Sequence, residues 1–189
     1  MISDRSVIAT QDELIAQRLR IAFPEQIFKL ERVPTAMTIK EFNRLARMTP
    51  FLGLAWQGMN VGNGARNLAG KMQWRLFLLT ATSSTLEARF KGDARGVGLD
   101  AMVNVAAALL NGVSFPDAGT LGVTKANAIV ADGFTDDNIA VAQVDFDFSF
   151  CTSQNDLELE TADDFEALGV TWSLAASDDI EPQDEITGA

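Results

Sequence analysis

Residues 141–151, with the sequence VAQVDFDFSFC, alternate apolar and polar side chains over most of their length. Side chains at every second position of a strand point to the same face of a sheet. Three phenylalanines therefore share one face and two aspartates share the other: Phe146, Phe148, Phe150, Asp145 and Asp147. This alternation is typical of a strand with one buried and one solvated face, so we expect the phenylalanines to fix its register.

Asp145 and Asp147 raise the question of a metal or proton-transfer site, because hard cations prefer carboxylate oxygens. Two carboxylates are too few for such a site, and the sequence supplies no third ligand at a fixed spacing. The chain contains no histidine, no tyrosine and one cysteine. A Ser-His-Asp arrangement, an imidazole ligand and a thiolate zinc site within one chain are therefore excluded. We expect no enzymatic activity, no metal and no cofactor.

The segment 58–70 is rich in glycine and asparagine and predicts a loop between two strands. Its Gly70-Lys71 pair resembles part of a phosphate-binding loop. Ala65 stands where that motif requires a glycine, however, and Met72 where it requires serine or threonine. We therefore expect no nucleotide site and interpret the segment as a loop at a subunit contact.

Two capping boxes predict helix starts at Thr10 and Thr38, because a glutamate follows each threonine by three positions. The clearest helix is the alanine-rich segment 98–110, which Asn111 and Gly112 terminate. Extended segments are expected at 27–33, 51–56, 71–81, 123–131 and 138–151, the last two forming a hairpin.

Charge is distributed unevenly along the 189 residues. All 15 Lys and Arg residues lie at or before Lys125, together with 10 acidic residues, whereas the last 64 residues contain 16 acids and no base. The length favours one domain. We predict a core at 1–151 and an acidic extension at 152–189, with one further strand at 170–175 followed by a flexible tail.

No apolar run approaches the roughly 20 residues that a membrane-spanning helix needs, and the N-terminus lacks the apolar segment of a signal peptide. The single cysteine, Cys151, fits a reducing compartment. We therefore expect synthesis in a cytoplasm and no membrane partner.

A basic cluster, Arg89, Lys91 and Arg95, falls in the segment 83–97, which is predicted to be a polar connection. Nucleic-acid binding is not favoured, because no aromatic platform or known binding module accompanies the cluster. A solvated loop and a contact with an acidic patch on a neighbouring subunit both remain open.

The order of elements resembles a known family. An N-terminal amphipathic helix precedes the strand TPFLGLAWQG, a glycine-rich segment, the strand QWRLFLLTATSS, a basic segment, the helix GLDAMVNVAAALLNG and a last strand pair ending in VAQVDFDFSF. Over roughly residues 8–151 this pattern is similar to the tail-terminator, or tail-completion, proteins of Mu-like phages and prophages. It is more distantly similar to the lambda-type tail terminators.

The resemblance implies an α+β fold, with a small, mixed, largely antiparallel sheet of about four to six strands and two or three helices packed on one side. It also implies a structural protein of the virion tail, assembled in the host bacterial cytoplasm. Such a protein forms a homo-oligomeric ring, a hexamer, that caps the tail tube and stops its polymerisation. Its other partners would be the head connector or neck protein and the sheath protein, and DNA would pass through without specific binding.

Two hypotheses connect residues to this function. Arg89, Lys91 and Arg95 would form part of a subunit interface, and Asp145 and Asp147 would face the ring channel and repel DNA. Other functions compatible with the sequence are another head–tail joining protein, an acidic DNA-mimic inhibitor and a carboxylate-based hydrolase.

Overall fold

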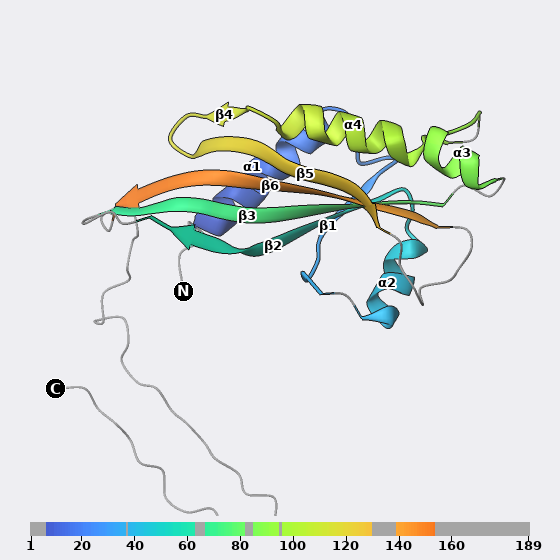
Figure 1. Cartoon of the computed structure of the whole chain (residues 1–189), viewed down its shortest axis with the longest axis horizontal. Helices are drawn as coiled ribbons and strands as arrows, with labels where there is room; N and C mark the ends of the chain where they lie inside the picture. The colour runs from blue at the N-terminus through green and yellow to red at the C-terminus, as the bar shows by residue number, and fades with distance from the viewer. Residues whose placement is uncertain are drawn as a thin grey trace, which may run out of the picture.

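The computed structural model describes residues 7–36, 38–62, 67–81, 85–94, 96–129 and 139–153. A curved sheet forms its centre, with strand order β1-β2-β3-β6-β5-β4 (Figure 1). The strands are β1 (Lys29–Arg32), β2 (Phe51–Val61), β3 (Asn67–Thr80), β4 (Ser114–Phe115), β5 (Gly119–Ile129) and β6 (Ala140–Ser153). The helices are α1 (Val7–Arg20), α2 (Ile39–Ala46), α3 (Leu86–Lys91) and α4 (Leu99–Leu110). The predicted α+β class is confirmed.

The sheet is mixed, because β1 runs parallel to β2 while the remaining pairs are antiparallel. Strand β6 lies between β3 and β5, and its pairing with β3 is continuous from Asn67↔Ser153 to Thr80↔Ala140. The predicted hairpin of the last two long strands is confirmed as β5 and β6. Strand β5 begins earlier than expected, and β4 was not predicted.

The predicted loop at 58–70 is wrong at both of its ends, because β2 continues to Val61 and β3 already begins at Asn67. The glycines serve the strands instead. Gly58, with φ 143°, follows the bulge after Trp56, and a side chain at Gly70 would collide with the Asn60 carbonyl. Glycine permits this conformation and this close approach of two backbones, so its abundance here marks a bent hairpin.

One face of the sheet packs against α1 and α4 and forms the larger core. Phe146, Phe148 and Phe150 all lie in it, as the alternation predicted, and each is at most 4% exposed. The indole Nε1 of Trp74 donates a hydrogen bond of 3.1 Å to Oε1 of Gln11, a buried side chain on α1. A buried indole requires such a partner.

Helix α1 begins at Val7, so the helix start predicted at Thr10 is wrong. Gln11, Ile15 and Leu19 are spaced four residues apart and form its buried side, and the helix extends upstream of the threonine to complete this face. The helix start at Thr38 is confirmed, because its side chain accepts a hydrogen bond of 3.2 Å from the backbone amide of Glu41 and caps α2.

The helices cover both faces of the sheet unequally. Helices α1 and α4 lie on the face of the three phenylalanines, whereas α2 covers one end of the opposite face (Figure 1). There, Phe42 and Leu45 pack in a smaller core with Phe51, Phe77 and Leu79. The remainder of this second face has no helix of the described chain over it.

The segment 83–97 is not only a polar connection, because it contains α3, which the Thr85 side chain caps at its N-terminus. Helix α4 is confirmed within one residue, and Gly112 after its C-cap has φ 73°. Strand β6 reaches Ser153, two residues beyond the predicted core boundary. The rest of the extension, with its predicted strand at 170–175, lies outside the described residues.

We expect Phe146→Ala to destabilise the fold by about 3–5 kcal/mol, because it removes a buried ring from the centre of the larger core. The measurement is urea unfolding followed by circular dichroism. Val105→Ala on α4, where the side chain is 38% exposed, serves as control and should change the unfolding free energy by less than about 0.5 kcal/mol. Equal effects of the two substitutions would contradict the assigned face of β6.

Candidate functional site

The second face of the sheet carries a row of polar side chains along its central strands. Asp145 and Asp147 both point to this face, as predicted, and β3 places Arg75 and Gln73 directly opposite them. On the other side of β6, β5 places Lys125 opposite Asp145. The sequence alone did not reveal Arg75, because its relation to Asp145 depends on the pairing of strands 70 residues apart.

Arg75 and Asp145 form a two-pronged ion pair. The guanidinium Nε donates to Oδ1 at 2.6 Å and Nη2 donates to Oδ2 at 3.0 Å. Gln143 also donates from Nε2 to Oδ2 of Asp145 at 3.2 Å. Both charged side chains are mostly buried, with 26% and 20% exposed for Arg75 and Asp145. Paired hydrogen bonds of this geometry are stronger than a simple surface contact.

The second pair is looser. Lys71 lies 3.4 Å from Oδ2 of Asp147 and its side chain is 63% exposed. A shallow hollow of ≈ 370 Å³ lies beside this pair, lined in part by Thr120, Thr124 and Ser149 of the neighbouring strands. An exposed lysine–carboxylate contact of this kind contributes little to stability.

The polar face is therefore close to charge balance and does not offer two bare carboxylates. Asp145 lies between Arg75 on β3 and Lys125 on β5, and Lys71 on β3 contacts Asp147, which disfavours a bound metal ion at this position. No group of three or more His, Cys, Asp or Glu that could hold a metal occurs within the residues that the structure describes. The lining of a ring channel by Asp145 and Asp147 stays a prediction. Arg75 and Lys71 would then line the same channel, because they pair with these aspartates.

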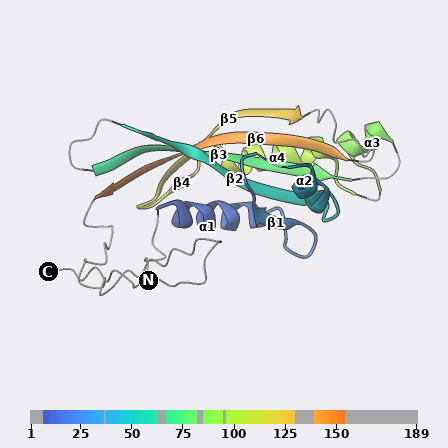
Figure 2. The ribbon, with the colours of Figure 1, turned by 90° about the horizontal axis from the view of Figure 1, so that it is seen from below.

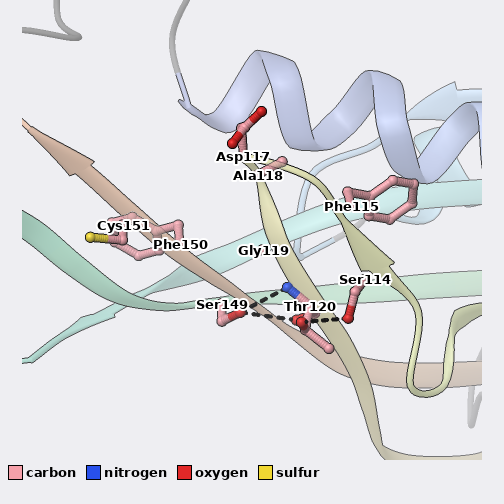
Figure 3. Close-up of a pocket in the computed structure, with 9 residues that line it drawn as sticks. All are labelled: Ser114, Phe115, Asp117, Ala118, Gly119, Thr120, Ser149, Phe150 and Cys151. Carbon is pink, nitrogen blue, oxygen red and sulfur yellow. Dashed lines mark hydrogen bonds between the residues drawn. The ribbon is translucent and has the colours of Figure 1, made fainter.

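A second hollow, of ≈ 450 Å³, lies at the turn between β4 and β5 (Figure 3). Ser149 Oγ accepts a hydrogen bond of 2.8 Å from the Thr120 amide, and the hydroxyls of Ser114 and Thr120 are 2.9 Å apart. Figure 3 shows that Asp117 and Cys151 point away from these hydroxyls. The polar groups therefore hold the turn together, and no acid or base lies among them to activate a hydroxyl.

The turn itself requires unusual backbone geometry. Asp117 has φ 61° and Gly119 has φ 123°, and a side chain at Gly119 would collide with the Ser149 carbonyl. Glycine is the residue that tolerates both conditions. We interpret this hollow as a by-product of the tight β4–β5 connection.

Two of the three residues of the predicted basic cluster lie on α3. Arg89 and Lys91 occupy its last turn, and Nζ of Lys91 contacts Oε1 of Glu87 at 2.7 Å. Arg95 lies outside the described residues. The cluster is thus partly helical, which places its charges at fixed positions.

Helix α2 contributes further basic residues that sequence reasoning missed: Lys40, Arg44 and Arg47. Their spacing of four and three residues places them on one side of a helix, a signal that was readable in the sequence. Arg44 donates to carboxylate oxygens of Glu31 at 3.0 Å and Glu41 at 2.7 Å. The hydrogen bonds from Arg44 hold the pKa of Glu41 below its ordinary value.

Helices α2 and α3 lie at the same end of the molecule, and β6 ends at the opposite end (Figures 1 and 2). Residues 38–47 and 85–91 together contain five basic and two acidic residues. The 36 residues that follow Ser153 contain 11 acidic residues and no base. Helices α2 and α3 thus carry a net positive charge at one end of the core, and the chain that continues from Ser153 is strongly acidic.

A scan against protein-family models found no matching family, and a search of curated proteins found no matching relative. Among the described residues, no helix is both long enough and apolar enough to cross a membrane.

We predict that the two ion pairs of the polar face differ in strength. A double-mutant cycle with Arg75→Gln and Asp145→Asn should give a coupling free energy of about 1 kcal/mol, because the pair is bidentate and mostly buried. The matched cycle with Lys71→Gln and Asp147→Asn should give about 0.3 kcal/mol or less. Urea unfolding of the seven proteins, the unmodified chain included, measures both couplings, and equal couplings would refute this description of the face.

Proposed function

We propose that this protein is a structural subunit of a phage tail, a tail terminator that assembles into a ring on the end of the tail tube. The observation that carries the proposal is the charge polarity of the subunit. Basic helices lie at one end of the sheet and β6 ends at the other (Figure 1), and the 36 residues after Ser153 contain 11 acids and no base. The family resemblance in element order over the core supports the same function.

Charge polarity suits a ring because each subunit of a ring contacts two neighbours through two different surfaces. A basic end on one copy and the acidic segment of the next would be complementary, because 36 extended residues are long enough to run back along a strand of 14 residues. Complementary charges raise the rate of encounter and fix orientation more than they raise affinity. Every contact around the ring would then be the same, and each contact would join two different surfaces.

The polar face of the sheet would line the channel of this ring. Its ion pairs, Arg75–Asp145 and Lys71–Asp147, leave little net charge for a phosphate backbone to bind. A charge-balanced lining would let DNA pass without adhering, because phosphate contacts supply most non-specific affinity. The remaining partners, the tube protein and the head connector or neck protein, would meet the two rims.

The experiment that tests the proposal is a measurement of particle mass together with negative-stain microscopy of the purified full chain. Six chains of 20.4 kDa give a ring of about 122 kDa. Rings should bind the tips of tail tubes and halt their growth in a polymerisation assay. A monomer that binds and inhibits a nuclease would instead identify an acidic DNA mimic, and rings that bind only connectors would identify a neck protein.

We predict that reversing the charge of α3, with Arg89→Glu/Lys91→Glu, weakens ring formation about tenfold or more, because like charges would then face each other. Sedimentation velocity over a concentration series measures the effect. The charge-conserving variant Arg89→Lys/Lys91→Arg is the control and should assemble as the unmodified chain does. An unchanged particle size in the reversed variant would reject α3 as an interface.

We predict that neutralising the aspartates, with Asp145→Asn/Asp147→Asn, increases retention of duplex DNA by the ring at low salt, because Arg75 and Lys71 are then unbalanced. The increase should disappear as salt is raised. A matched control is Asp100→Asn/Asp117→Asn, which removes the same charge from exposed positions away from the polar face. Equal retention by the two variants would remove the polar face from the channel.

A further inference from the structure

Two strand edges of the sheet are open over part of their length. Strand β1 pairs with β2 only from Phe51 to Leu54, and the Thr35 hydroxyl then donates to the Trp56 carbonyl at 2.9 Å. Beyond this point, no residue within the described ranges pairs with the outer edge of β2. Side chains 59–61 at this edge are exposed.

The opposite edge of the sheet shows the same feature. Strand β4 pairs only with Gly119 and Thr120 of β5, and the last contact along the strand is a hydrogen bond of 3.2 Å from the Val123 amide to Asn111 Oδ1. From residue 124 to residue 129, the described part of the chain provides no strand that pairs with the outer edge, although Asn127 Nδ2 donates to the Ala128 carbonyl at 3.2 Å. Figure 2 shows β5 as the outermost long strand on this side.

Open edges carry unpaired N–H and C=O groups and readily accept another strand. Proteins commonly protect such edges with charge, proline or a covering element. Residues 57–61, with the sequence QGMNV, contain neither a charge nor a proline, and residues 124–129 contain only Lys125. Within the described residues, the β2 edge therefore lacks this protection, and the β5 edge carries a single lysine.

We propose that the edge of β2 at residues 57–61 pairs with the edge of β5 at residues 124–128 of a second copy, so that one sheet continues across subunits. This inference rests on the proposed ring. Within one chain β2 and β5 point in opposite directions, since each of the three pairs between them is antiparallel. Rotation about an axis roughly along the strands preserves this relation, so β2 meets β5 of the next copy as an antiparallel pair.

The faces of the sheet specify the register. Met59 is paired with Met72, and Ala126 with Val144, and both partners lie in the larger core, so Met59 and Ala126 project to the same face. Placing Met59 opposite Ala126 aligns the two open segments along their whole length and keeps each face continuous. The exposed Met59 and the small Ala126 side chain are then neighbours across the junction.

Polar side chains at the two edges are complementary as well. Gln57 Nε2 is a buried donor and Asn127 Oδ1 a buried acceptor, and neither has a hydrogen-bond partner in the described part of the chain. In the proposed register Gly58 lies opposite Asn127, which brings Gln57 within one residue of it. Unpaired buried polar groups cost free energy, so a contact that satisfies both favours association.

The register also gives the ring its geometry. Within one chain Met59 lies at the level of Phe148, whereas Ala126 lies at the level of Val144, four residues away along β6. Successive copies are therefore displaced by about 13 Å along the strands, while four strands span about 19 Å across the sheet. These lengths correspond to a tilt of about 35°, within the range of roughly 35–45° typical of closed barrels.

The test uses full-length chains carrying Cys151→Ser, so that only introduced thiols react. Under mild oxidation, Met59→Cys/Ala126→Cys should form a ladder of disulfide-linked chains up to the complete ring, because directly opposed Cβ atoms lie within about 5.5 Å. The matched control Asn60→Cys/Ala126→Cys places the thiols on opposite faces and should form no ladder. Hydrogen exchange of the unmodified chain should slow at 57–61 and 124–128 on assembly.

Particle mass, measured on the same samples, separates the possible failures. Rings that form no disulfide ladder and show no slowed hydrogen exchange at 57–61 and 124–128 would overturn the strand pairing. They would leave the proposed function standing. Dimers cross-linked by Met59→Cys alone would show that β2 pairs with β2, which also overturns the inference. Monomers at every concentration, even with tail tubes present, would remove the ring and the strand pairing together.

Discussion

The burial of the three phenylalanines of β6 in the larger core is the constraint on which the rest of the fold depends. Strand β6 pairs with β3 along its whole length and with most of β5, so a shift by one residue would move every one of its side chains to the wrong face. The same register aligns Asp145 with Arg75 and Lys125. Core packing on one face thus determines the ion pairs on the other.

This arrangement explains why two aspartates that suggest a metal or proton-transfer site in the sequence form ion pairs in the structure instead. A carboxylate that accepts two hydrogen bonds from Arg75 and one from Gln143 is held in place and already neutralised. The hydroxyls at the β4–β5 turn are likewise bonded to one another. Polar groups that are bonded in this way are suited to defining a surface, which is what the proposed ring subunit would require.

The proposed assembly depends on two features of the subunit, its opposite charges and its open strand edges. Opposite charges at the two ends act over the distance of approach, whereas open strand edges act only on contact and require a defined register. The first would bring copies together in the correct order, and the second would fix the displacement between them. Specific association commonly combines such long-range and short-range terms.

Local pattern alone determined the strand at 141–151 with its two faces, the helix at 98–110, the cap at Thr38 and the charge asymmetry, because each depends on residues close in sequence. Tertiary structure decided the strand character of residues 58–61 and 67–70 and the upstream start of α1. It also decided the position of α2 on the second face and the pairing of Arg75 with Asp145. In the sequence, a run of glycines indicates a loop. The role of Gly70 in a bent hairpin becomes visible only in the structure, where its backbone approaches the Asn60 carbonyl closely. Contacts between distant segments carry no local signature, because they arise when the register of a sheet brings those segments side by side.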